Sequence, residues 1–240
     1  MNALIPLTLV AGAAVGAHFM KDGAPSWCPL ACSDSAASSL VLEGDDVKGD
    51  DKKPVKYEVG STIEETLALK DIDGKTHTMK DLRGKVVFIH FHSMHCPFMT
   101  PATPKIKQFQ KDYAEKAVVV LAINANQAEI GEAPKETSFA APYEELKEYV
   151  KENEVRYPIC VDHGNKLSER FQARTTPHCY VIDAKGVLRY AGALDDDPKG
   201  EKGADAKNYV RLAVDSLLEG KDVETATTKP YGCSIQTGKK

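Results

Sequence analysis

The chain has 240 residues, of which 42% are hydrophobic and 28% charged, and its formal net charge is −4. This length allows one main domain with a full hydrophobic core. The slightly acidic balance, with no basic cluster, argues against nucleic-acid binding.

Residues 1–20 are predicted to be a signal peptide or an N-terminal membrane anchor. Residues 2–19 contain no Lys, Arg, Asp or Glu and are rich in Leu, Val, Ala and Gly. The apolar run is short for a membrane span but suits the core of a signal peptide. No basic residue precedes the run, so an uncleaved anchor stays open. We therefore expect an extracytoplasmic protein, periplasmic or secreted, with or without membrane attachment.

Residues 21–57 are expected to form a flexible tether. Residues 33–39 are small and polar, and residues 43–53 carry a mixed but acidic run of charges. Neither stretch can bury much apolar surface, which favours disorder. Cys28 and Cys32 form a CxxxC pair in this tether. The pair could close a small disulfide, bind a metal or recruit a partner, and the sequence does not choose between these.

Residues 58–220 alternate between strand-like and helix-like segments, which predicts an α/β domain. The run 85–91 is apolar on both faces, as expected of a central strand covered by helices. The polar stretch 124–142 is longer than a usual connection, and we interpret it as an insertion near the functional site. The other predicted strands are 66–69, 75–78, 117–123, 157–161, 178–183 and 187–190. The predicted helices follow Cys96 and span 143–153, 166–171 and 204–219, the last with Gly220 as its cap.

Cys96 stands where the central strand passes through a short polar turn into a helix-like segment. A cysteine at a helix N-terminus faces unpaired backbone N–H groups and the positive end of the helix dipole. Both favour the thiolate, which is the reactive form of the side chain. Pro97 suits the first helical turn, where its missing N–H has no cost. The placement predicts redox or nucleophilic sulfur chemistry, and the alternative is a buried cysteine that acts as a small hydrophobe.

A second motif, Thr176-Pro177, lies just before another apolar strand. An X–Pro bond can be cis at modest cost, which allows a tight turn that exposes backbone. Together with the run from Phe91 to Cys96 and with Pro104 in the following helix, this arrangement resembles the thioredoxin-like redoxins of the AhpC/TSA and TlpA-like group. The resemblance covers about residues 58–220. It implies a thioredoxin-like fold, in which a central mixed β-sheet is covered by helices on both faces, and a Thr176-Pro177 loop that lies against the nucleophile Cys96.

The chain departs from this group at two positions. Thioredoxins carry a second cysteine where this chain has Met99, so an exchange within one helical turn is ruled out. Peroxiredoxins carry a proline where this chain has Ile89, although Ser93 fits their pattern. These departures favour thiol–disulfide or general redoxin activity, with peroxide reduction as the alternative.

Two histidines are candidates for moving protons. His90 occupies the place of the buried acid of thioredoxins, and a core histidine is the equally weighted alternative for it. His95 directly precedes Cys96 and, if protonated, would lower the pKa of that thiol. A non-catalytic scaffold that binds copper or a partner through His95, Cys96 and His178 is the rival class of function.

The resolving partner of Cys96 is predicted to be Cys233, on a flexible tail that spans residues 221–240. Cys160 and Cys179 are expected to lie in the core. Asp195-Asp196-Asp197 is interpreted as a solvated loop rather than a cation site. No cofactor and no metal ligand set are assigned. The expected partners are a protein or small-molecule disulfide, or a peroxide, together with an external thiol reductant.

Overall fold

The computed structural model of the chain describes residues 55–135 and 142–236. The predicted leader and nearly all of the tether, including Cys28 and Cys32, lie outside these residues. The strands are β1 (Ala68–Lys70), β2 (Thr76–Thr78), β3 (Val86–His92), β4 (Val118–Asn124), β5 (Ile159–Val161), β6 (Thr175–Thr176), β7 (His178–Ile182), β8 (Leu188–Gly192) and β9 (Cys233–Ser234). The α-helices are α1 (Met99–Asp112), α2 (Gln127–Ile130), α3 (Glu144–Glu152), α4 (Lys166–Phe171) and α5 (Tyr209–Leu218).

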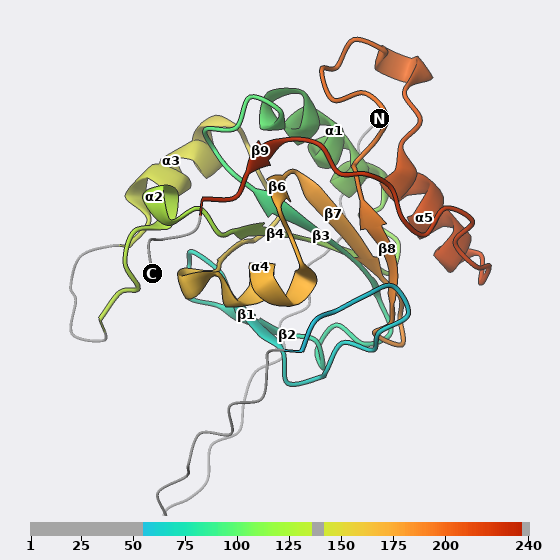
Figure 1. Ribbon diagram of the computed structural model, residues 1–240, viewed down its shortest axis with the longest axis horizontal. Coiled ribbons are helices and arrows are strands. Elements are labelled where there is room, and N and C mark those ends of the chain that lie inside the picture. Colours follow the sequence, from blue (N-terminus) through green and yellow to red (C-terminus); the bar gives the residue numbers. More distant parts are fainter. Residues whose placement is uncertain (1–54, 136–141, 237–240) are drawn as a thin grey trace, which may run out of the picture. The chain divides into compact units, whose positions relative to one another are not determined.

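Five strands form the central sheet in the order β5-β4-β3-β7-β8 (Figure 1). The middle strand β3 pairs in parallel with β4 and antiparallel with β7, so the sheet is mixed. All seven residues of β3 are buried, as the continuous apolar run predicts. The predicted α/β fold with a mixed central sheet is confirmed.

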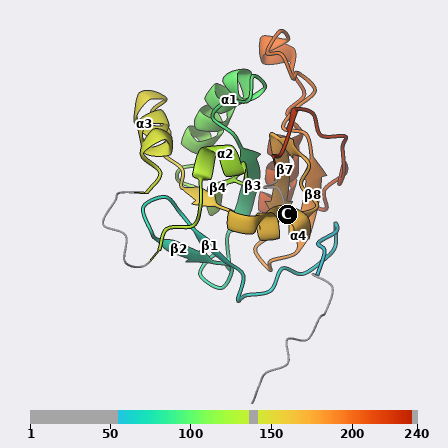
Figure 2. The ribbon, with the colours of Figure 1, turned by 60° about the vertical axis from the view of Figure 1, so that its left-hand side comes forward.

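The two faces of the sheet are covered by different elements. Side chains alternate along β3, so Phe88 joins one core with α1, α3 and α5, whereas Ile89 and Phe91 join a second core with α4 and the β1–β2 hairpin. Figure 2 shows α1 and α3 on one side of the sheet and the β1–β2 hairpin on the other. No helix within 55–135 and 142–236 has the length and apolar character needed to cross a bilayer.

The last helix, α5, differs from its predicted range of 204–219 because its cap lies further along the chain. The Asn208 side chain accepts a hydrogen bond from the Arg211 N–H at 2.9 Å and so marks the helix start. Gly220 follows the helix with a φ of +72°, as the predicted cap requires. Leu218, the last residue of the helix, is 37% exposed.

The C-terminal segment also differs from the expected flexible tail. Residues 226–236, which we call the strap, run along β8 and the Thr176-Pro177 loop (Figure 1). The Thr228 N–H donates to the Ala191 carbonyl at 3.2 Å, and the Ile235 N–H donates to the Arg174 carbonyl at 3.0 Å. Hydrogen bonds along its length therefore dock the strap against the domain.

Candidate active site

The Cys96 thiol lies at the carboxyl end of the central strand, in the turn between β3 and α1. The helix begins at Met99, whose N–H donates to the Cys96 carbonyl at 2.9 Å. Pro97 therefore lies just before the helix. The prediction that it lies in the first helical turn is wrong. The Cys96 side chain is only 4% exposed, and its Sγ–H donates to the Thr176 carbonyl at 2.9 Å.

The loop that faces Cys96 contains a cis peptide bond between Thr176 and Pro177. The two residues of β6 pair antiparallel with β9, which sets Thr176 opposite Cys233 and Thr175 opposite Ser234. Gly232 makes this close approach possible, because a Cβ atom there would lie 2.1 Å from the Thr176 carbonyl oxygen. The strand pairing therefore brings Cys233 into the same cavity as Cys96.

The environment of Cys96 favours its thiolate. Burial raises the pKa of Cys96, but hydrogen bonds from the Thr176 side chain, from Cys233 and from the Phe98 N–H outweigh it, so the pKa lies below the ordinary value. The Thr176 hydroxyl is buried, and no other group in the described part of the chain competes with the Cys96 sulfur for it. Donors to the sulfur thus come from the strap, the loop and the turn before α1.

Cys233 has the opposite shift. Its hydrogen bond with Cys96, then burial and the charge of Cys96, raise the pKa of Cys233 to about 11. The two thiols therefore titrate as a pair, and Cys96 carries the charge while Cys233 keeps the proton. Cys160 and Cys179 lie in the core as predicted, and burial raises the pKa of each.

A buried carboxylate, Glu129, organises the turn that precedes Cys96. Its side chain on α2 is 7% exposed and accepts hydrogen bonds from the Ser93 hydroxyl, the Met94 N–H at 3.0 Å and the Asn124 side chain at 2.6 Å. Burial raises the pKa of Glu129, but these hydrogen bonds outweigh it, so its pKa lies below the usual range. Glu129 is therefore ionised at neutral pH.

Glu129 was missed by the sequence prediction. Its position in the polar stretch after β4 was a usable signal. Because β3 and β4 are parallel, their carboxyl ends lie at the same edge of the sheet, and the residues that follow them lie close together. We expected the stretch 124–142 to lie near the functional site, and the position of α2 beside Cys96 agrees with this. Residues 136–141 of the stretch lie outside the described part of the chain.

The predicted proton-moving histidines lie in different places. His95 is 72% exposed, and its Nδ1 lies 3.4 Å from Glu129 at the cavity described below. His90 is fully buried next to Phe88 and Tyr157, and neither ring nitrogen has a partner among residues 55–135 and 142–236. Burial, followed by the proximity of His92, lowers the pKa of His90 well below its usual value. His90 is therefore neutral.

The copper hypothesis placed His95, Cys96 and His178 around one ion. The structure turns the His178 ring toward Tyr180, whose hydroxyl lies 3.0 Å from Nδ1. Burial, followed by the charge of Arg174, lowers the pKa of His178 to about 4. Within the described ranges, no three His, Cys, Asp or Glu side chains gather as a metal site. The three predicted ligands therefore do not form a ligand set here.

The interpretation of residues 195–197 as a solvated loop is wrong for two of the three aspartates. Asp195 and Asp197 are 1% and 3% exposed. The Lys105 ammonium on α1 donates to Asp195 at 2.7 Å and to Asp197 at 3.0 Å. A lysine distant in sequence therefore pairs with both carboxylates, while Asp196 pairs with Lys202 nearer the surface.

A cavity of about 360 Å³ opens beside the two thiols. Its wall is formed by the turn before α1, by α2, by Thr176 and by the strap. The lining residues are Ser93, His95, Cys96, Asn126, Ala128, Glu129, Thr176, Cys233, Ser234 and Gln236. The cavity is the size of a small organic molecule and gives access to Cys96, Cys233, His95 and Glu129 together.

The mixed sheet, the cysteine before α1 and the cis-proline loop define a thioredoxin-like redoxin. The chain belongs to the AhpC/TSA family, whose family model matches residues 59–191. It is 28% identical over 118 residues to the thiol-disulfide oxidoreductase ResA of Bacillus cereus, a match that covers 49% of this chain and 60% of that protein. The matched part is therefore less than two thirds of that relative.

Two other similarities agree with this family. The thioredoxin-like protein YneN of Bacillus subtilis is 25% identical over 138 residues, which cover 58% of this chain and 73% of that protein. A crystal structure of a hypothetical protein from Sinorhizobium meliloti superposes with a TM-score of 0.65 at 27% identity, over 77% of this chain and 97% of that one.

Proposed function

We propose that this protein is a thiol–disulfide oxidoreductase in which Cys96 is the nucleophile and Cys233 resolves the mixed disulfide. The observation that carries the proposal is the pairing of β6 with β9, which sets Cys233 opposite Thr176, the residue whose carbonyl accepts from the Cys96 thiol, so that both cysteines line one cavity beside the cis-proline loop. The similarity to proteins named thiol-disulfide oxidoreductases supports the same class of reaction.

In the first step, the Cys96 thiolate attacks one sulfur of a disulfide. A bond forms between Cys96 and that sulfur, the substrate S–S bond breaks, and the other sulfur leaves as a thiolate that takes up a proton. His95 is assigned to deliver this proton because it lines the cavity with Cys96 and reaches solvent. His90 is buried away from the cavity lining, and a role for it in proton transfer stays a prediction.

In the second step, Cys233 attacks the Cys96 sulfur of the mixed disulfide. The Cys96 thiolate is the main reason that the pKa of Cys233 is raised. Once Cys96 is covalently bound, that cause disappears, so the Cys233 thiol can lose its proton and attack. A Cys96–Cys233 bond forms and the second substrate thiol leaves. The substrate gains two electrons, and an external thiol reductant returns them to the protein.

Peroxide reduction is the less favoured hypothesis for the reaction at this site. The Ser93 hydroxyl, which fits the peroxiredoxin pattern, donates to Glu129 and is not free for a peroxide. An arginine that steadies the thiolate would favour peroxide reduction, but Arg170 forms an ion pair with Glu64. The cavity lining contains no arginine among the described residues. These contacts support disulfide exchange as the main reaction.

The test counts thiols released from an aromatic disulfide in a background that carries Cys28→Ser and Cys32→Ser. We expect this background protein to release both thiols of the disulfide rapidly. With Cys233→Ser added, only one should be released and the other should stay on Cys96. With Cys96→Ser added, the rapid phase should vanish. A rapid phase that survives Cys96→Ser would overturn the proposal.

An extracytoplasmic location forms part of this proposal and rests on the apolar, charge-free residues 2–19. Fractionation of cells that express the full chain tests it. Recovery in the cytoplasmic fraction would contradict it.

A further inference from the structure

We propose that the strap, residues 226–236, makes this site selective for low-molecular-weight disulfides by occupying the edge at which an extended polypeptide would bind. This inference rests on the proposed function and adds the class of substrate to it.

The first observation concerns the edge itself. A short edge strand such as β6 presents backbone N–H and C=O groups to which another extended segment can add. Here β9 pairs with both residues of β6, and the Ile235 N–H extends the pairing to the Arg174 carbonyl at 3.0 Å. An incoming peptide can pair with Thr175 and Thr176 only if it displaces the strap.

The second observation is that Cys233 stands where a substrate cysteine would be attacked. It lies opposite Thr176, whose carbonyl accepts from the Cys96 thiol, and it lines the same cavity as Cys96. The strap thus places its own sulfur against the nucleophile in an extended conformation. A polypeptide substrate would compete with Cys233 for the same place, while a small disulfide needs only the cavity of about 360 Å³ beside the thiols.

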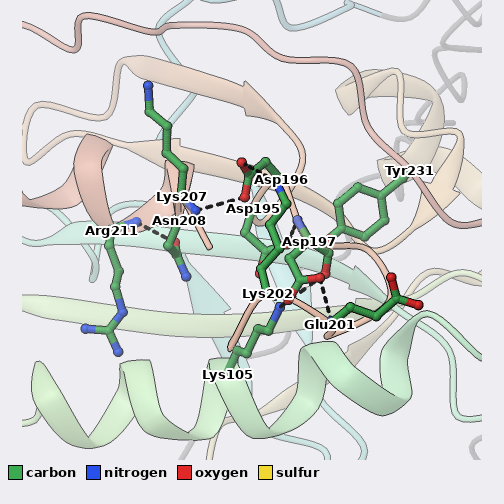
Figure 3. Close-up of polar contacts among 10 residues, drawn as sticks. All are labelled: Lys105, Asp195, Asp196, Asp197, Glu201, Lys202, Lys207, Asn208, Arg211 and Tyr231. Carbon is green, nitrogen blue, oxygen red and sulfur yellow. Dashed lines mark hydrogen bonds and ion pairs between the residues drawn. The ribbon is translucent and has the colours of Figure 1, made fainter. Parts of the chain in front are cut away.

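The third observation is that the strap is held at both sides of Cys233. Ahead of it, the Tyr231 hydroxyl donates to the buried Asp195 at 2.7 Å, and Lys105 on α1 holds the other oxygen of that carboxylate (Figure 3). Behind it, the Gln236 N–H donates to the Asn126 side chain at 2.9 Å. The buried ion pair therefore ties the strap to the helix that follows the nucleophile.

Earlier in the strap, the Thr228 hydroxyl accepts a hydrogen bond from the Ala193 N–H at 2.9 Å. Gly192 leaves room for this threonine, since a Cβ at Gly192 would lie 2.2 Å from the Thr228 hydroxyl oxygen. The strap is thus fitted to the domain along most of its length, which opposes its displacement by a peptide.

The test compares two disulfides with the same leaving group. The small one is 2-hydroxyethyl disulfide, and the large one is an unstructured peptide whose single cysteine is joined to 2-mercaptoethanol. The quantity measured is the ratio of their rates with Cys96, because the ratio cancels changes in the intrinsic reactivity of that thiol. All proteins carry Cys28→Ser and Cys32→Ser, and the strap-release variants add Gly232→Ala alone or with Tyr231→Phe.

With an intact strap, we expect the peptide to react more slowly than the small disulfide by roughly tenfold or more, because it reacts only with the fraction of molecules whose strap is released. Gly232→Ala, which forces a side chain against the Thr176 carbonyl, should bring the two rates together. Thr227→Ala, which changes an exposed side chain on the strap outside the cavity lining, should leave the ratio unchanged. Faster chymotryptic cleavage after residue 231, which is Tyr or Phe in these proteins, verifies that the strap is released in the Gly232 variants.

Equal rates for the two disulfides with an intact strap would overturn the inference and leave the proposed function standing. An unchanged ratio in a variant whose strap is released, as judged by chymotryptic cleavage after residue 231, would also overturn the inference and leave the proposed function standing. A Cys96 that reacts with neither disulfide, with or without the strap, would overturn the proposed function and this inference with it.

Discussion

Glu129→Gln replaces one carboxylate oxygen of a buried side chain by an amide NH₂ group. The carboxylate accepts from four donors: the Ser93 hydroxyl, the Met94 and His95 N–H groups and the Asn124 side chain. A glutamine has one accepting oxygen, so about two of these donors would face an NH₂ group. A buried donor without an acceptor costs about 1–3 kcal/mol, so we expect a loss of at least about 2 kcal/mol in the free energy of unfolding.

The effect should depend on pH with a definite sign. The pKa of Glu129 is lowered in the folded protein, so its contribution to stability is fully present above its unfolded pKa of about 4.3 and is lost as the pH falls through the folded pKa. The difference between the wild type and Glu129→Gln should therefore be largest near neutral pH and shrink below about pH 4.

Urea unfolding at several pH values measures this difference, with Glu132→Gln as the control. Glu132 is exposed on the same segment, so its substitution removes the same charge without the hydrogen bonds. The reasoning would be refuted if Glu129→Gln changed the stability at pH 7 by less than about 0.5 kcal/mol, the range of an ordinary surface substitution.

Three further predictions concern the thiols and the buried histidine. Cys233→Ala removes a donor to Cys96. The alkylation rate of Cys96 at pH 7 should therefore fall by roughly two- to tenfold, the range for one hydrogen bond. An unchanged rate would show that the donor is unimportant. Cys160 and Cys179 should stay unalkylated in the native protein under conditions that label Cys96, since burial raises the pKa of both, and mass spectrometry of the digest would reveal any label that contradicts this. His90→Leu removes two unpartnered buried nitrogens, so the free energy of unfolding should rise or stay within about 1 kcal/mol of the wild-type value. The pH profile of Cys96 alkylation should be unchanged. A shifted profile would instead assign the His90 ring to proton transfer.

Local sequence patterns were enough to predict the framework of the site. The apolar run of β3 followed by a polar turn predicts where Cys96 lies, since both features are contiguous in sequence. Most strands and helices of the domain were predicted because their burial follows a regular period. The start of α5 was misplaced because charged and small residues before Asn208 do not resemble a helix break.

Long-range pairings could not be predicted in the same way. A two-residue strand such as β9 has no period, so nothing in the tail sequence shows that it pairs with Thr176. The run 195–197 looks like a solvated loop until Lys105, from another element, is found against it. Glu129 lies on a helix of four residues, too short for a pattern, and only the shared edge of parallel strands points to it.

The most direct test of the central claim is a peptide map of the protein after oxidation by a limiting amount of a small disulfide. Alkylation of the remaining thiols, followed by digestion without reductant, identifies the bond that has formed. The account predicts one linked peptide pair that joins Cys96 to Cys233, with Cys160 and Cys179 recovered as free thiols. A Cys96 recovered unmodified, or joined to any other cysteine of the chain, would contradict it.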